Sequence, residues 1–305
     1  MENDTLQEEL QNKDIQILKE EPLSKHTTFK IGGPAAMLAE VKNIRQLVSL
    51  VYMARKNNFR YMVMGNGSNI LFPDDGYRGL VIKTSPHFGS IIVDDDHILR
   101  CEAGALLSKA AAVAAENGLS GLEFAQGIPG TVGGALYMNA GAYGGEIGDL
   151  VFRTCYMDPK GEMRMIDREE HRFGYRTSRF KEIPESIILY TELSLKEGDP
   201  AAIREKMAEY AARRKEKQPI DLPSAGSVFK RPKDHYAGEL IERCGLKGYR
   251  VGDAMVSEKH AGFIVNCGKA TCEDVLAVIE HVEKTVLEQT GVQLEREVRV
   301  IRHKK

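Results

Sequence analysis

The sequence has 305 residues, enough for two or three domains at a typical size of roughly 150 residues. Hydrophobic residues make up 42% and charged residues 28%, which excludes disordered, collagen-like and coiled-coil chains. The 42 Lys and Arg nearly balance the 44 Asp and Glu, and the net charge of −2 argues against a nucleic-acid-binding protein, which normally carries a basic excess. Any anionic ligand must therefore be met by local cations.

Membrane attachment and metal binding are not expected from the sequence. No stretch approaches the roughly 18 consecutive apolar residues that cross a bilayer, and the N-terminus is acidic where a signal peptide is basic. We expect a cytoplasmic protein with no obligate protein partner. The cysteines form no CxxC pair and the eight histidines no HExxH spacing, so we predict scattered buried thiols and no metal site. The cysteines are Cys101, Cys155, Cys244, Cys267 and Cys272.

The first half of the chain mixes helical and strand patterns. Sparse apolar residues over 1–25 predict a helical arm, and apolar spacing after Asn43 predicts an amphipathic helix that leads to a buried strand at 61–64. An Ala-rich helix over 106–117 should stop at Gly118. Further short strands are predicted at 80–82, 91–93, 98–101, 151–157, 163–166 and 186–193.

The second half has its own alternation of helix and strand. A charged helix over 200–217, terminated by Pro219, is predicted to connect two domains. A helix over 237–244, a strand over 262–266 and a longer helix after the capping-box-like Thr271–Asp274 follow. A final strand is predicted over 292–301. The whole pattern indicates an α+β protein.

The turn Gly65-Asn66-Gly67-Ser68-Asn69 follows the predicted strand at 61–64 and begins like a dinucleotide-binding fingerprint. Ile70 replaces the third glycine, and Pro73 forbids the helix that should follow, so this is not a Rossmann site. A turn rich in N–H donors can still cradle a phosphate. A plain tight turn is the alternative.

A second glycine-rich segment is Gly127-Ile128-Pro129-Gly130-Thr131-Val132-Gly133-Gly134. A proline where a helix would start, followed by small residues, predicts a helix whose free N–H groups lie against an anion. Tight packing of that helix on a sheet explains the glycines equally well. Two such cradles without a Walker lysine favour a flavin dinucleotide over ATP, and the absence of Cys and His from 127–148 predicts that it is held non-covalently.

Three further segments carry polar groups that, as bare sequence, also fit ordinary surface. These are Phe173–Phe180 with Arg176, Pro223–Pro232 with Ser227, and Leu294–Val300. In the last of these, period-two alternation places Leu294, Val298 and Val300 on one side and the charged residues on the other.

Six motifs together resemble the UDP-N-acetylenolpyruvoylglucosamine reductases in order and spacing, over roughly residue 24 to the end. They are TTFKIGG at 27–33, GNGSN at 65–69, GIPGTVGGALYMNAGAYGGEIGD at 127–149, YRTSRF at 175–180, PSAGSVFKRP at 223–232 and EREVR at 295–299. The chain is similar to the shorter subclass, because it lacks the extra loop whose tyrosine closes over substrate in the longer one.

The resemblance implies a fold and a reaction. The fold is an FAD-binding region of the vanillyl-alcohol-oxidase (PCMH) type, made of two α+β subdomains, followed by an α+β substrate-binding domain. We expect an arm over 1–25, subdomains at about 26–84 and 85–196, and a substrate domain over 200–305. The implied reaction is reduction of UDP-N-acetylglucosamine enolpyruvate to UDP-N-acetylmuramate by NADPH through FAD, for peptidoglycan synthesis.

The resemblance also assigns residues. It implies that Arg176 stabilises negative charge on the substrate, that Ser227 supplies a proton, and that Glu297 holds or relays it; an ion pair of Glu297 with Arg296 or Arg299 is the alternative. The substrate contacts are Tyr137, Tyr175, Arg231 and Arg299. The cofactor-binding set is Gly65, Asn66, Gly67, Ser68, Asn69, Gly127, Ile128, Gly130, Thr131, Gly133, Gly134, Asn139 and Gly141.

Two other functions share parts of this pattern. An FAD-dependent alcohol or lactone oxidase of the same fold would keep the glycine motifs without the set of Arg176, Ser227 and Glu297. A nucleotide-sugar sensor would keep the fold and lose turnover. Flavin absorbance separates both enzymes from a flavin-free sensor, and oxygen consumption separates an oxidase from a reductase.

Overall fold

The computed structural model describes residues 15–84 and 87–302, and their contacts divide them into two units. Unit 1 contains the described residues up to Leu18, Met37–Asn66 and Gly79–Arg213. Unit 2 contains Lys19–Ala36, Gly67–Arg78 and the described residues from Arg214. The predicted division into an arm, two FAD subdomains and a substrate domain stays a prediction.

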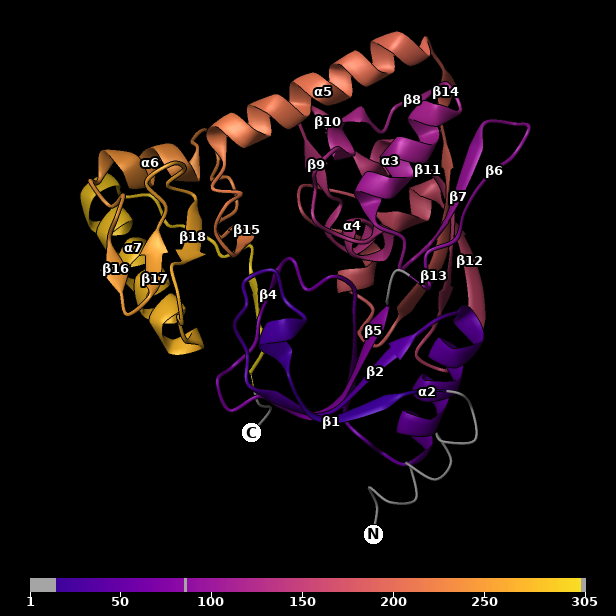
Figure 1. Ribbon diagram of the computed structural model, residues 1–305, viewed down its shortest axis with the longest axis horizontal. Helices are drawn as coiled ribbons and strands as arrows, with labels where there is room; N and C mark the ends of the chain where they lie inside the picture. The colour runs from indigo at the N-terminus through magenta and orange to yellow at the C-terminus, as the bar shows by residue number, and fades with distance from the viewer. Residues whose placement is uncertain (1–14, 85–86, 303–305) are drawn as a thin grey trace. The chain divides into compact units, whose positions relative to one another are not determined.

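The first sheet has the strand order β1-β2-β5-β3, of which Figure 1 labels β1, β2 and β5. Its strands are β1 (Ile17–Pro22), β2 (Pro34–Val41), β5 (Tyr77–Thr84) and β3 (Tyr61–Met64). Helix α2 (Ile44–Lys56) begins at Asn43, whose side chain accepts from Gln46 N–H. Apolar residues of α2 and of these strands make one buried cluster in unit 1, because the amphipathic spacing of α2 places Leu47, Leu50 and Val51 on one face.

The second sheet of unit 1 has the strand order β12-β11-β13-β7-β6 and is antiparallel throughout. Its strands are β6 (Ile91–Val93), β7 (Ile98–Glu102), β11 (Val151–Met157), β12 (Met163–Asp167) and β13 (Ile187–Ser194), which confirms the strands predicted there. Helices α3 (Leu107–Glu116) and α4 (Val132–Met138) share a buried cluster with β7, β11 and β13. The short pairs are β8 (Leu119–Ser120) with β14 (Lys196–Glu197), and β9 (Gly141–Ala142) with β10 (Gly145–Glu146).

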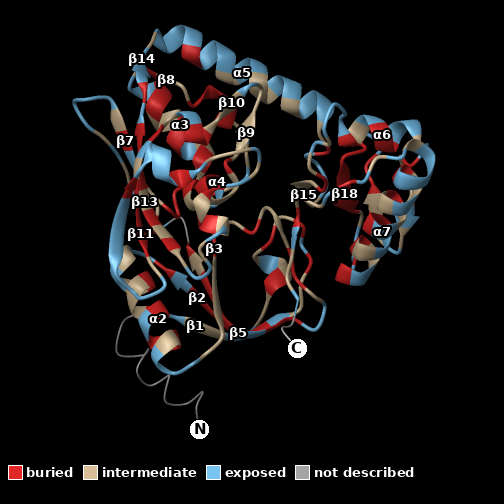
Figure 2. Cartoon of the chain, turned by 180° about the vertical axis from the view of Figure 1, so that it is seen from behind, coloured by how far each residue is buried: buried red, intermediate tan, exposed pale blue. Residues whose placement is uncertain are grey.

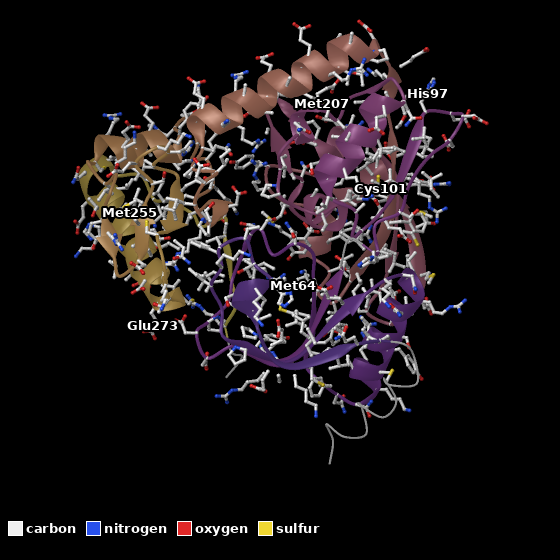
Figure 3. The ribbon with its side chains drawn as sticks, in the orientation of Figure 1. Met64, His97, Cys101, Met207, Met255 and Glu273 are labelled. Atoms are coloured by element: carbon white, nitrogen blue, oxygen red, sulfur yellow. The ribbon has the colours of Figure 1, made fainter. Side chains whose placement is uncertain are left out.

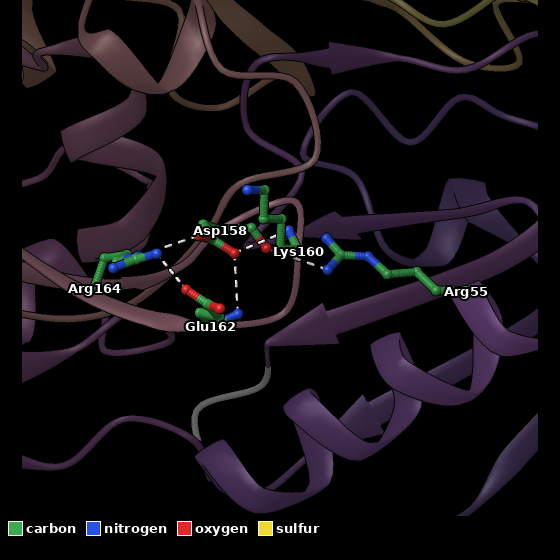
Figure 4. A network of polar contacts seen from close by, with 5 residues as sticks. All are labelled: Arg55, Asp158, Lys160, Glu162 and Arg164. Carbon is green, nitrogen blue, oxygen red and sulfur yellow. Dashed lines mark hydrogen bonds and ion pairs between the residues drawn. The ribbon is translucent and has the colours of Figure 1, made fainter.

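Arg55 connects α2 to the turn between β11 and β12 (Figure 4). Its Nη1 donates to the carbonyl of Asp158 at 3.2 Å and its Nε donates to the hydroxyl of Tyr61 at 2.9 Å. In the same turn the carboxylate of Asp158 pairs with Arg164 at 3.2 Å and accepts from the N–H of Lys160 and Glu162. Segments about a hundred residues apart are thereby joined inside unit 1.

Helix α5 (Pro200–Lys217) is exposed along most of its length, as Figure 2 shows, and Ile203 is its one buried residue. The division between the units falls within this helix, at 213 and 214. The predicted helix is therefore confirmed, and its role as a connector between domains stays a prediction.

Unit 2 is built on a sheet with the strand order β15-β18-β17-β16 and two helices. The strands are β15 (Ser224–Ser227), β16 (Arg250–Val251), β17 (Ala254–Val256) and β18 (Phe263–Asn266), and the helices are α6 (Ala237–Arg243) and α7 (Cys272–Thr290). The predicted capping box is confirmed at the start of α7: Thr271 Oγ1 accepts from Asp274 N–H, and the Asp274 carboxylate accepts from Thr271 N–H.

Two predicted elements are wrong. Residues 17–22 of the predicted helical arm form β1 and 23–25 a 3-10 turn, because Pro22 disfavours helix before it and β2 offers strand partners; residues 1–14 lie outside the described residues. The final strand is limited to β19 (Arg299–Val300), which pairs in parallel with β4 (Ile70–Leu71). The predicted alternation still holds, since Leu294 and Val298 are buried.

Candidate active site

The first two residues of the first cradle, Gly65 and Asn66, lie beside the second cradle in unit 1. Asn66 Nδ2 donates to the carbonyl of Pro129 at 2.9 Å, and a Cβ on Gly65 would lie 2.3 Å from Thr131 Oγ1. Gly65 is therefore required by the approach of Thr131, and Asn66 holds the second segment to the end of β3. Gly127 has a φ of +77°, a turn conformation that glycine adopts without strain, and Ile128 packs against the apolar cluster.

The sequence predicts free N–H groups at the start of α4, and this prediction is wrong for residues 132–134. Val132 N–H donates to Ala105 O at 2.8 Å, Gly133 N–H to Ala103 O at 2.9 Å, and Gly134 N–H to the N-cap hydroxyl of Thr131 at 3.3 Å. Two backbone carbonyls and the Thr131 hydroxyl thus accept from the N–H groups of the first turn of α4. Within the described residues, the N–H groups of Gly130 and Thr131 have no protein acceptor, so donors for an anion lie in the turn before the helix.

The glycines of this segment have different causes. A Cβ on Gly133 would lie 2.8 Å from the Cβ of Ala103, so close packing explains this glycine. Gly134 is exposed, and the nearest atom to an added Cβ is Thr131 Oγ1 at 3.5 Å. The space beside Gly134 is the part of the cradle that the fold leaves open to a ligand.

Asn139 ends α4 in the left-handed conformation, with φ +46°, and its side chain is fully buried. Its Nδ2 donates to Glu146 Oε1 at 2.8 Å and to Gly174 O at 3.0 Å, and its Oδ1 accepts from Gly148 N–H at 3.0 Å. Gly141 lies in the short hairpin that follows, where a Cβ would be 2.6 Å from the carbonyl of Gly145. Both residues contact protein in the structure.

Tyr175 and Arg176 form the tip of a tight hairpin in unit 1. Gly174 and Thr177 exchange backbone hydrogen bonds at 3.1 and 3.2 Å, and Arg176 has a φ of +55°. The guanidinium of Arg176 lies 5.1 Å from the ring centroid of Tyr175 and donates to Gly141 O at 3.1 Å. The ammonium of Lys181 donates to Arg176 O at 2.6 Å and lies 5.5 Å from the ring centroid of Tyr137.

Ser227 and Glu297 are neighbours in unit 2. Ser227 ends β15, and its Oγ donates to Phe229 O at 3.2 Å. Glu297 N–H donates to Val228 O at 2.7 Å, so the backbones that carry Ser227 and Glu297 run side by side.

The Gly67-Ser68-Asn69 part of the first turn belongs to the same unit. Gly67 has a φ of +63°, and Ser68 follows it. Asn69 Nδ2 donates to Glu297 O at 3.2 Å, and Arg299 N–H donates to Asn69 O at 3.0 Å. The predicted cofactor turn and the predicted catalytic strand are thereby joined.

The cations of the last strand and its neighbouring loop have assigned partners. Arg296 donates to both carboxylate oxygens of Glu283 at 2.7 and 2.6 Å, so its charge is matched on α7 rather than by Glu297. The guanidinium of Arg231 lies 4.2 Å from the ring centroid of Tyr236. Lys230 pairs with Glu295.

The sequence analysis did not identify Lys181 or His260. His260 Nδ1 accepts from Gly262 N–H at 3.1 Å, and a Cβ on Gly262 would lie 3.0 Å from the imidazole and 3.3 Å from Ser227 Oγ. Burial lowers the pKa of His260 from its ordinary value. Both contacts are local, two and five residues apart, but neither residue belongs to a motif with a known spacing, so the sequence drew no attention to them.

The cysteines and possible metal ligands were also located. All five cysteines are free thiols, with Cys244 and Cys267 only partly buried. Burial raises the pKa of Cys101, labelled in Figure 3, to about 12, so this thiol stays protonated. Within residues 15–84 and 87–302 we find no group of three His, Cys, Asp or Glu side chains that could hold a metal ion, and no helix long and apolar enough to cross a membrane.

The two units therefore carry different chemical groups: one suits the binding of an anion and the other the transfer of a proton. Unit 1 carries a glycine-lined turn with open N–H donors and a guanidinium at a hairpin tip. Unit 2 carries a hydroxyl beside a carboxylate-bearing strand.

Comparison with known proteins gives this arrangement a family. Residues 35–167 match the family model of an FAD binding domain, and residues 218–301 match that of the UDP-N-acetylenolpyruvoylglucosamine reductase C-terminal domain. A reductase of this name from Caldanaerobacter subterraneus subsp. tengcongensis is 47% identical over 95% of this chain and 97% of its own. One from Agathobacter rectalis is 48% identical over 93% of this chain and 94% of its own.

Solved structures agree. The crystal structure of UDP-N-acetylenolpyruvylglucosamine reductase from Thermus caldophilus is 38% identical, with a TM-score of 0.79 over 94% of this chain and 98% of that one. Glucooligosaccharide oxidase from Acremonium strictum is 13% identical with a TM-score of 0.50 over 95% of this chain and 60% of that one, a likeness of fold alone. The expected α+β fold with a PCMH-type FAD-binding region is confirmed. With relatives this similar over almost its whole length, the chain belongs to the UDP-N-acetylenolpyruvoylglucosamine reductase family, whose members are FAD-containing oxidoreductases.

Proposed function

We propose that this protein reduces the enolpyruvyl ether of UDP-N-acetylglucosamine to UDP-N-acetylmuramate at the expense of NADPH. The observation that carries the proposal is the near full-length similarity to reductases of that name, at 47–48% identity, with an FAD binding domain and the reductase C-terminal domain both matched. The product is a precursor of peptidoglycan, and we place its formation in the cytoplasm.

The residues of the two glycine-rich segments, 65–69 and 127–134, fit a dinucleotide. The open side of Gly134 and the N–H groups of Gly130 and Thr131 provide space and donors for an anion, and Gly65, Asn66 and Gly127 shape the turn. When bound, FAD would accept hydride from NADPH and deliver hydride to the substrate. Gly67, Ser68, Asn69, Ile128, Gly133 and Gly141 complete the proposed binding set. We place no covalent bond to the flavin, because 127–148 contains no Cys or His.

Arg176 is the proposed electrostatic catalyst. Hydride addition to the methylene carbon of an enol ether drives negative charge through the adjacent carbon into the carboxylate. A guanidinium can stabilise that charge with two parallel hydrogen bonds. Support for this role comes from the left-handed backbone of Arg176, which the surrounding contacts hold fixed before substrate arrives.

Ser227 is the proposed general acid, and Glu297 the residue that holds or relays the proton. An enolate-like carbon is basic enough to take a proton from a correctly placed hydroxyl. The backbones at Val228 and Glu297 lie side by side in an antiparallel arrangement, which supports a shared role. Tyr137, Tyr175, Arg231 and Arg299 are the proposed contacts of the UDP-sugar, since a diphosphate and a carboxylate need several cations that the net charge does not supply.

The test is NADPH oxidation by the purified protein with and without the enolpyruvyl UDP-sugar. We expect oxidation that depends on the sugar and is slower with NADH. Sugar-independent oxygen consumption would instead indicate an oxidase. Sugar binding without turnover of a flavin-free protein would indicate a sensor.

A further inference from the structure

The hairpin that carries Arg176 is held by residues 137–141, which run from the last turn of α4 into the residues after it. Three hydrogen bonds join them, and they involve every second residue of this segment. Ser178 Oγ donates to Tyr137 O at 2.9 Å, and Asn139 Nδ2 donates to Gly174 O at 3.0 Å. Arg176 Nη2 donates to Gly141 O at 3.1 Å. All of these residues belong to unit 1. The hairpin base, its tip and its exit are therefore each fixed to one short stretch of chain.

Arg176 needs such support because of its backbone. Its φ of +55° is a left-handed conformation that residues with a side chain seldom adopt. Lys181 donates its ammonium to Arg176 O at 2.6 Å, which fixes the carbonyl on the far side of the residue. Without these contacts the hairpin tip could relax and the guanidinium would move.

Asn139 is the residue at the centre of this arrangement. Its side chain is 0% exposed, and both hydrogens of its amide have protein acceptors, Glu146 Oε1 and Gly174 O. Its oxygen accepts from Gly148 N–H. A side chain so occupied has no N–H left for a cofactor.

We propose that Asn139 is a positioning residue for Arg176, assisted by Lys181, and that it does not contact the flavin. Asn139 holds Gly174 at the hairpin base, and the guanidinium of Arg176 is thereby held at the orientation in which it meets the substrate carboxylate. This inference rests on the proposed function, in which Arg176 stabilises charge during reduction of the enolpyruvyl sugar.

The test is Asn139→Gly in the full-length holoenzyme. Glycine keeps the φ of +46° accessible and removes the side chain with its three hydrogen bonds. We expect a normal flavin content and a normal rate of flavin reduction by NADPH, with reoxidation by the enolpyruvyl sugar slowed on the order of 10²-fold, the cost of a small misplacement in an active site. Asn58→Gly is the matched control, because Asn58 is an exposed residue with a φ of +49° just after α2.

A double-mutant cycle with Arg176→Ala shows whether Asn139 acts through Arg176. In the Arg176→Ala background, Asn139→Gly should slow reoxidation no further. An undiminished effect there, or loss of flavin from Asn139→Gly, would overturn the positioning role. If Asn139→Gly does not fold, Lys181→Met replaces it in the cycle, and Lys181→Arg should restore the rate that Lys181→Met loses.

The two hypotheses fail differently. A reoxidation rate unchanged by Arg176→Ala would remove Arg176 from the proposed function, and this inference with it. A rate lowered by Arg176→Ala but unchanged by Asn139→Gly would overturn the positioning role alone.

Discussion

We expect different effects from the same alanine substitution at the neighbouring glycines 133 and 134: lower stability at the first and weaker FAD binding at the second. Gly133→Ala would press a methyl group against Ala103, which should lower the free energy of unfolding by about 1–3 kcal/mol. Gly134→Ala fits the protein, with Thr131 Oγ1 3.5 Å away, but fills the open side of the cradle. We expect it to fold normally and to bind FAD at least about tenfold more weakly, a loss of roughly 1.4 kcal/mol.

Flavin content and urea unfolding of both variants measure these outcomes. Full flavin retention in soluble Gly134→Ala would mean that helix packing alone explains the glycines of this segment. Equal stability of the two apoproteins would mean that the contact of Gly133 with Ala103 can relax.

Ser227→Ala separates the two half-reactions. Reduction of the flavin by NADPH needs no proton from Ser227, whereas reoxidation by the enolpyruvyl sugar needs one delivered to carbon. We therefore expect stopped-flow absorbance to show unchanged reduction and reoxidation slowed by about 10²- to 10⁴-fold, the usual contribution of general acid catalysis. Equal slowing of both steps would assign Ser227 a binding or structural role and leave Glu297 or water as the proton source.

His171 predicts how stability varies with pH. Its ring is buried between Phe173 and Phe180, its Nδ1 is 2.8 Å from Asp167 O, and burial lowers its pKa below the ordinary value of 6.5. As pH falls below that value, the unfolded chain binds a proton that the folded protein refuses. The free energy of unfolding should then fall by up to about 1.4 kcal/mol per pH unit.

Urea unfolding at about pH 7.5 and about pH 5 measures this term. In His171→Phe the group that titrates is absent, so its loss of stability between the two pH values should be smaller than that of the unaltered protein. An equal loss in both proteins would assign the pH dependence to other groups.

At the scale of elements, the N-terminus of α7 is supported by a residue distant in the sequence as well as by its own capping box. The two carboxylate oxygens of Asp74 accept from Cys272 N–H at 2.8 Å and Glu273 N–H at 3.2 Å, at the helix end where Figure 3 labels Glu273. A carboxylate there both satisfies unpaired donors and opposes the positive end of the helix dipole.

Asp74→Ala should therefore lower the free energy of unfolding by about 1–2 kcal/mol. Chemical denaturation measures the change, and Asp95→Ala, in an exposed turn, is the control that should leave stability unaltered. An effect no larger than that of Asp95→Ala would mean that the local capping box of Thr271 and Asp274 suffices.

Elements with strong local signals were predictable from the sequence. The capping box of α7, the glycine stop after α3 and the short strands of the second sheet all depend on residues within a few positions of one another. The final strand was not, because its backbone partners come from far along the chain: Glu297 N–H donates to Val228 O, and β19 pairs with β4. The N-terminal arm was not either, because its strand depends on pairing with β2, which lies outside its own segment.

The candidate site divides in the same way. Glycine motifs located the cradle, but not which glycines serve packing, since Ala103 and Thr131 reach them only in the folded chain. The resemblance implied both Arg176, as a catalytic residue, and Asn139, as a cofactor contact. The hydrogen bond of Asn139 to Gly174 could not be predicted, because Gly174 lies 35 residues away and the contact exists only in the folded chain.

For the whole molecule, FAD should behave as a non-covalent ligand that stabilises the fold. Acid or heat denaturation should release flavin from the polypeptide. Removing FAD should lower the melting temperature, because a ligand at 100 times its dissociation constant adds about 2.7 kcal/mol to the folded state. Flavin that stays on the denatured chain would contradict the first expectation, and identical melting of apo- and holoprotein the second.

Unit 2 is built from segments that lie far apart in the sequence, so the coding sequence cannot be cut at one point without dividing the unit. Its buried cluster includes Phe29, Ile31 and Leu71 together with residues of the 218–301 family match. A gene segment that encodes only residues 218–301 would lack Phe29, Ile31 and Leu71, which complete this buried cluster. If the same segment came from a relative, its apolar residues would have to pack against these three side chains of the present protein. Recombination at the family boundary should therefore seldom yield a working hybrid, so the reading frame is expected to be inherited as an undivided whole.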